Sequence, residues 1–141
     1  MKLEEGISFV RNISQLRYKT GVIYGYPQSG KSKYAVDLAN DTNLIYVDVL
    51  AEILPNLSEP LGAYDHVSFI RNIESVAKQN ESGMILDDVE PLLATFGKDR
   101  ANAFFQAFSR MQVSKPIIVV THLETMIEQN FPSDRILHLT H

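Results

Sequence analysis

The sequence contains no cysteine, so it can form neither a disulfide bond nor a thiolate metal site. It also lacks any apolar run near the ~18 residues that a membrane-spanning helix needs, and residues 1–6 are too acidic to begin a signal peptide. The net charge is −4 and no run of Lys or Arg occurs, so a strong electrostatic footprint for nucleic acid is missing. These absences favour a cytoplasmic protein that contacts no membrane and meets nucleic acid only indirectly, through a local patch or a basic partner.

The chain has 141 residues, 45% of them hydrophobic, which is typical of one globular domain. We expect residues 1–19 to form an N-terminal helix and linker, and residues 20–141 to form the core. Residues 3–16 place apolar side chains at helical spacing, which predicts an amphipathic helix packed beside the core.

One segment matches the phosphate-binding loop pattern G-x-x-x-x-G-K-[ST] at every fixed position. Its glycines let the backbone turn its N–H groups toward a phosphate. The lysine can reach the β- and γ-phosphates, the last serine can bind Mg²⁺, and the following helix points its positive dipole end at the phosphates. The predicted nucleotide-binding residues are Gly25, Tyr26, Pro27, Gln28, Ser29, Gly30, Lys31 and Ser32, with Ser32 also a metal ligand.

Strands alternate with helices along the rest of the chain, which predicts an α/β fold with a mainly parallel sheet. In such sheets ligands lie at the carboxyl ends of the strands. The expected strands span 20–25, 43–48, 84–86, 116–122 and 135–139. The expected helices span 31–39, 49–54, 65–79, 99–111 and 124–129, with Asp65 as an N-cap and Pro91 opening a further short helix.

The third predicted strand is apolar and ends in acidic residues. Asp87, at its tip, would hold Mg²⁺, which favours carboxylate and phosphate oxygens. Asp88 follows at the position of a water-polarising acid, and Glu90 is the alternative base. Thr121 and His122 end the fourth predicted strand, where a polar side chain can contact the γ-phosphate or the attacking water.

Two further groups of side chains are expected to be structural. The stripe Phe104, Phe105, Phe108 and Met111 predicts a core face, and His66, His138 and His141 have no partner pattern and are expected at the surface or in packing. Tyr18, just before the first strand, is a weak candidate for lining the base pocket.

With both motifs placed, residues 20–139 resemble the P-loop ATPases of the additional-strand type, which include the AAA+ and RecA-like families. Gly25-Tyr26-Pro27 and Leu86-Asp87-Asp88 are similar to AAA+ segments, although Gln28 replaces a common Gly. Residues 119–122 look equally like RecA-type or ABC-type ATPases. The resemblance implies the P-loop NTPase fold: a three-layer sandwich with a five-stranded sheet in the order 5-1-4-3-2.

The resemblance also raises the question of how the site is completed. AAA+ proteins continue into a helical lid, which this sequence does not show, so we expect a homo-oligomer neighbour or a partner protein to close the site. In this family an Arg from the next protomer usually acts on the γ-phosphate. The resemblance makes Arg135 the candidate and Arg110 the runner-up, with a surface salt bridge as the alternative for each. In size and motif order the chain is similar to the BrxF component of BREX-type phage-defence systems.

Three functions fit these features. The first is a Mg²⁺-dependent ATPase that drives or gates a larger assembly, with ATP and Mg²⁺ as cofactors. The second is a nucleotide-dependent switch or scaffold subunit that does not hydrolyse ATP. The third is a small P-loop kinase, but no Arg-rich lid segment is evident among the six Arg residues. A strand bearing Asp87 directly beside the loop strand would favour the kinase.

Overall fold

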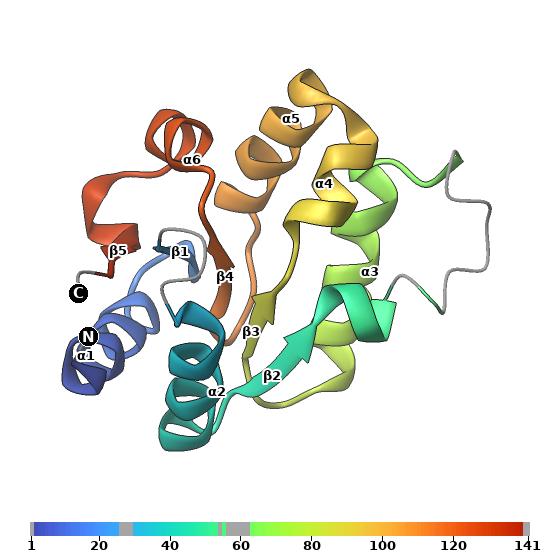
Figure 1. The fold of residues 1–141 in the computed structure, drawn as a ribbon. Coiled ribbons are helices and arrows are strands. Elements are labelled where there is room, and N and C mark those ends of the chain that lie inside the picture. Colours follow the sequence, from blue (N-terminus) through green and yellow to red (C-terminus); the bar gives the residue numbers. More distant parts are fainter. Residues whose placement is uncertain (1, 26–29, 54, 56–62, 140–141) are drawn as a thin grey trace.

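The computed structural model describes residues 2–25, 30–53, 55 and 63–139 (Figure 1). The strands are β1 (Thr20–Tyr24), β2 (Ile45–Asp48), β3 (Met84–Asp87), β4 (Ile117–Thr121) and β5 (Ile136–His138). The helices are α1 (Leu3–Ile13), α2 (Lys31–Thr42), α3 (His66–Gln79), α4 (Glu90–Phe96), α5 (Lys98–Ser109) and α6 (Glu124–Asn130). A π-helical turn, η1 (Val49–Ile53), and a 3-10 turn, η4 (Ser133–Arg135), complete the described elements.

The five strands form one parallel sheet in the order β2-β3-β4-β1-β5. Read from its other edge, this is the predicted order 5-1-4-3-2, so the fold class is confirmed. The strand that carries Asp87 is separated from the loop strand β1 by β4. Because all five strands are parallel, their carboxyl ends lie at one edge of the sheet, which we call the carboxyl edge.

Helices cover both faces of the sheet, giving the three-layer sandwich of the P-loop NTPase fold (Figure 1). Side chains alternate between faces along each strand. Ile23, Ile85, Ile118 and Val120 lie on the face that packs against α1 and α2. Val22, Leu86 and Val119 lie on the opposite face, in the core with α3, α4, α5 and α6. Both faces are buried, which explains the continuous apolar strands.

The aromatic stripe of α5 lies at the centre of the larger core, as predicted. Phe104 stacks on Phe69 of α3 with ring centroids 4.9 Å apart and on Phe108 at 5.6 Å. Offset and stacked aromatic pairs of this kind add to the stabilisation from area burial alone. The N-cap of α3 is also confirmed, since the Asp65 side chain accepts a hydrogen bond from the Ser68 N–H at 2.9 Å.

Several predicted boundaries were wrong by two or three residues. The helix after the loop continues to Thr42 because Asn43, not Asn40 or Asp41, adopts the left-handed conformation (φ 59°) that ends it. The first helix ends at Ile13 rather than residue 16, since the Ser14 hydroxyl donates to the Arg11 carbonyl and the next N–H groups form 3-10-type bonds. No helix within the described ranges is long and apolar enough to cross a bilayer.

Candidate functional site

The junction between β1 and α2 holds the described ends of the phosphate-binding loop at the carboxyl edge. Gly25 donates its N–H to the carbonyl of Thr121 at 3.1 Å, which fixes the start of the loop to the end of β4. Gly30 has φ 82°, a conformation that favours glycine, and α2 begins immediately after it. Lys31 and Ser32 occupy the first turn of α2, half-buried and exposed respectively. Tyr26, Pro27, Gln28 and Ser29 lie outside the described residues.

Asp87 is a buried carboxylate held on two sides. It lies at the end of β3 with 1% of its surface exposed, on the sheet face that α2 covers. The Tyr46 hydroxyl donates to its Oδ2 at 2.6 Å, and the Asp88 N–H donates to its Oδ1 at 2.9 Å. The carboxylate predicted to hold the metal therefore faces the same layer as Ser32.

A second acid, Asp48, meets this group from the end of β2. Asp48 and Asp87 occupy paired positions in the β2–β3 ladder. Asp88 itself has φ 57°, a left-handed conformation that is uncommon outside glycine and that clusters at functional sites. Burial, the charge of Asp87 and a side-chain hydrogen bond to Asp48 raise the pKa of Asp88 to about 6. Protonated Asp88 is thus well populated just below neutral pH.

Glu90 is engaged by the end of β4. Its Oε2 accepts the backbone N–H of His122 at 3.1 Å and lies 3.8 Å from the His122 Nε2. Two of the predicted site residues, one at the start of α4 and one immediately after β4, are therefore brought together. This contact connects the acidic turn after β3 to the turn after β4.

Thr121 lies on the other face of the sheet from Asp87, because it pairs with Tyr24 in the layer that packs against the larger core. It is fully buried, and its Oγ1 accepts the Leu123 N–H at 3.2 Å. The structure therefore gives this hydroxyl a role in shaping the turn into α6. Its predicted contact with a γ-phosphate stays a prediction.

Arg135 lies in the interior, which contradicts the alternative of a surface salt bridge. It is buried, with 7% of its surface exposed, and its guanidinium donates to the Thr20 carbonyl and hydroxyl and to the Ser109 carbonyl at 2.6–2.8 Å. Thr20 begins β1, so these bonds lie at the amino edge of the sheet, opposite the loop. A side chain held this way is not free at the surface, and its predicted contact with the nucleotide of a neighbouring subunit stays a prediction. Tyr18 packs against the same guanidinium at 5.7 Å, which places it away from any base pocket at the carboxyl edge.

The runner-up, Arg110, caps the end of α5 and is exposed. It follows Ser109, the residue whose carbonyl binds Arg135, and so also lies toward the amino edge.

Tyr46 and Asp48 are the site residues that sequence reasoning missed. Both lie on β2 and share the face that presents Asp87. A signal for them was available, since the predicted order places the second strand beside the third and its last residue is an acid. What the sequence did not show is the in-register pairing of Asp48 with Asp87, which requires the observed start of β2 at Ile45.

The donors at this edge fit Mg²⁺ that arrives with a nucleotide. Within the described ranges, no three acidic or histidine side chains form a ready-made metal cluster. Mg²⁺ in nucleotide sites is usually bound by one or two protein oxygens, phosphate oxygens and several waters. The Asp87 carboxylate and the Ser32 hydroxyl are oxygen donors of this kind, on one side of the sheet.

The sheet order, the loop between β1 and α2 and the acid ending β3 define the class as the P-loop NTPase fold. No family model matches the chain, and no curated protein matches it. Among solved structures, the chain is similar to C. elegans PCH-2, with 13% sequence identity and a TM-score of 0.49. The match covers 99% of this chain but only 42% of the PCH-2 chain. The P-loop NTPase domain of an E. coli sigma-54 activator is 13% identical with a TM-score of 0.40, covering 100% of this chain and 98% of that one.

Proposed function

We propose that this chain binds ATP with Mg²⁺ at the carboxyl edge of the sheet and hydrolyses it to drive or gate a larger assembly. The observation that carries the proposal is the alignment of three parts on one side of the sheet. Gly30 turns the backbone into α2, Lys31 and Ser32 follow in its first turn, and the buried Asp87 lies on the face that α2 covers. A phosphate-binding sequence pattern alone would not require this placement.

Each residue has a role that its position supports. The N–H groups at the start of α2 and the Lys31 ammonium would hold the phosphates, and Ser32 and Asp87 would hold the metal. Bound Mg²⁺ neutralises charge on the phosphate oxygens. Asp88, one residue beyond the metal ligand, would orient and deprotonate the attacking water. Its raised pKa, about 6, lies near the working pH, as general-base catalysis favours.

One observation favours the alternative of a switch that does not turn over ATP. Both candidate bases are already engaged: Asp88 is hydrogen-bonded to Asp48, and Glu90 binds the His122 N–H. In a switch subunit these contacts would persist when nucleotide is bound. In an ATPase they would be exchanged for contacts with water when a neighbouring subunit or partner completes the site.

The kinase alternative loses its structural support. It requires the strand bearing Asp87 beside the loop strand, and β4 lies between them. The assembly itself stays a proposal, because the likeness to a BREX-type phage-defence component rests on size and motif order alone. Since Arg135 is buried at the amino edge, a completing arginine would come from another position or another protein.

Nucleotide binding and phosphate release test the proposal directly. Wild type, Lys31→Ala and the matched control Lys33→Ala would be titrated with a fluorescent ATP analogue and Mg²⁺. Lys33 is an exposed neighbour paired with Asp37 at 3.3 Å. We expect Lys31→Ala to bind the analogue at least ~10-fold more weakly than wild type, and Lys33→Ala to bind it with unchanged affinity. Unchanged binding by Lys31→Ala would show that the site is misassigned. ATP binding without phosphate release, even with co-purifying partners, would favour the switch.

A further inference from the structure

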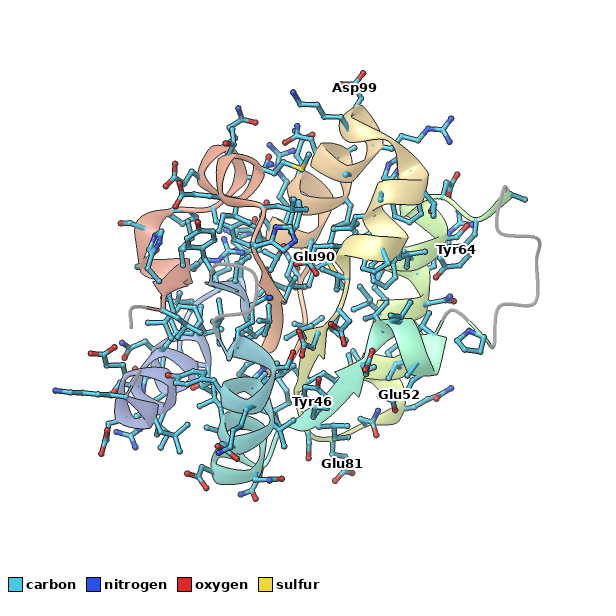
Figure 2. The ribbon with its side chains drawn as sticks, viewed as in Figure 1. Tyr46, Glu52, Tyr64, Glu81, Glu90 and Asp99 are labelled. Carbon is cyan, nitrogen blue, oxygen red and sulfur yellow. The ribbon has the colours of Figure 1, made fainter. Side chains whose placement is uncertain are left out.

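The phenol of Tyr46 reaches across from the edge strand β2 to the carboxylate at the tip of β3. Tyr46 precedes Asp48 by two residues, so both lie on the same sheet face, and Asp48 pairs with Asp87. Tyr46 is therefore the diagonal neighbour of Asp87, within reach of a long side chain. Figure 2 shows Tyr46 beside β2 on the side of the sheet where α2 lies.

The hydrogen bond from the Tyr46 hydroxyl to the Asp87 carboxylate is short. At 2.6 Å between the phenolic oxygen and Oδ2, it joins a neutral donor to an acceptor in a buried setting. Charge-assisted bonds of this length are about twice as strong as neutral ones. A phenol is a neutral hydroxyl donor throughout the physiological pH range.

The second oxygen of the carboxylate is held as well. Oδ1 accepts the backbone N–H of Asp88, so the two hydrogen bonds together fix rotation about the Cβ–Cγ bond. Each carboxylate oxygen can accept more than one bond. The remaining lone pairs are thereby presented in one direction. Without the phenol, the Asp88 N–H would be the one remaining restraint on this rotation among the described residues.

We propose that Tyr46 is a positioning residue that orients Asp87 for the metal and so sets the metal affinity of the nucleotide complex. This rests on the proposed nucleotide site. Outer hydrogen-bond partners of metal ligands characteristically tune affinity in this way. In this proposal Tyr46 acts only through its hydrogen bond to Asp87, so its substitution should leave metal-free nucleotide binding intact.

The test compares Tyr46→Phe with Tyr34→Phe. Tyr34 also lies near this side of the sheet, but its hydroxyl donates to the Lys2 carbonyl at 2.9 Å, away from the acids. Binding of Mn²⁺ to each protein–ATP complex would be measured by electron paramagnetic resonance, and ATP binding would be measured in EDTA. We expect Tyr46→Phe to weaken Mn²⁺ binding about 10-fold, with ATP binding in EDTA and the Tyr34→Phe control unchanged.

A double variant separates positioning from general damage. In an Asp87→Asn background, Tyr46→Phe should cause no further loss of Mn²⁺ affinity, because its effect acts through that carboxylate. Wild-type affinity in Tyr46→Phe, an equal loss in Tyr34→Phe, or an additive loss in the double variant would each overturn the inference. Absence of ATP binding by wild type would instead overturn the proposed nucleotide site.

Discussion

Asp48 and Asp87 stand directly opposite one another in the last register of β2 and β3. Like charges at paired positions of neighbouring strands destabilise a sheet. Asp88 adds a third carboxyl group beside them, hydrogen-bonded to Asp48. The carboxyl edge thus concentrates negative charge that a bound cation or a proton would offset, and the folded chain tolerates it at the expense of stability.

Asp88→Asn is therefore expected to stabilise the free protein at pH 7.5. The folded-state pKa of about 6 lies above the ordinary value of 3.8, so folding loses stability through this group as the pH rises from about 4 to about 6. Removing the charge should recover on the order of 1 kcal/mol, a figure reduced because solvent screens the partly exposed group. Calorimetric melting at pH 7.5 and pH 4.5 should show the gain at the higher pH only. Asp41→Asn, at an exposed position on α2, is the control.

The same substitution should have the opposite effect on catalysis. If Asp88 acts on water, Asp88→Asn should lower single-turnover phosphate release by at least ~100-fold, in the range usual for loss of a general base. Glu90→Gln should lower it less than about 10-fold, because its Oε2 is engaged by the His122 N–H. Greater loss in Glu90→Gln than in Asp88→Asn would assign the base to Glu90.

Arg135→Ala should destabilise the fold without changing turnover per folded molecule. The substitution leaves the buried Thr20 and Ser109 carbonyls without their charged donor, which should cost about 3 kcal/mol of unfolding free energy. Urea unfolding would measure the loss, and Arg135→Lys should recover part of it. A full-stability Arg135→Ala protein that loses only partner-stimulated ATP turnover would restore the arginine-finger hypothesis.

Two glycines offer a matched test of crowding against backbone conformation. A Cβ on Gly83 would collide with the Pro116 carbonyl oxygen, a rigid backbone group between β3 and β4, so Gly83→Ala should cost at least about 2 kcal/mol. Gly97 has open space around it, but its φ of 83° and ψ of 162° lie in a region that is open essentially to glycine alone, so Gly97→Ala should cost about 1–3 kcal/mol of strain. Chemical denaturation of both variants measures the two costs, and an unchanged stability of Gly83→Ala would contradict the collision.

The strands and the position of Asp87 at a strand tip could be predicted from the sequence, because apolar strands with acidic or glycine-rich ends can be recognised locally. The sheet order came from the resemblance to P-loop ATPases and not from any local pattern. Helix ends that depend on one backbone conformation were harder to predict. Asn43 ends α2 by adopting the left-handed conformation, but asparagine adopts this conformation at only some positions, so its presence alone does not locate the helix end. The least accessible feature was Arg135, whose interior position depends on carbonyl groups of Thr20 and Ser109, far away in the chain. No local pattern distinguishes such an arginine from an exposed one.

The strand made first lies in the interior of the sheet. β1 hydrogen-bonds to β4 on one side and to β5 on the other, and the buried arginine joins residues 20, 109 and 135. During synthesis the backbone groups of β1 can pair only after β4 and β5 have been made. Because such distant pairings close slowly, we expect nascent chains to remain protease-sensitive until residues 136–138 have left the ribosome and can pair with β1.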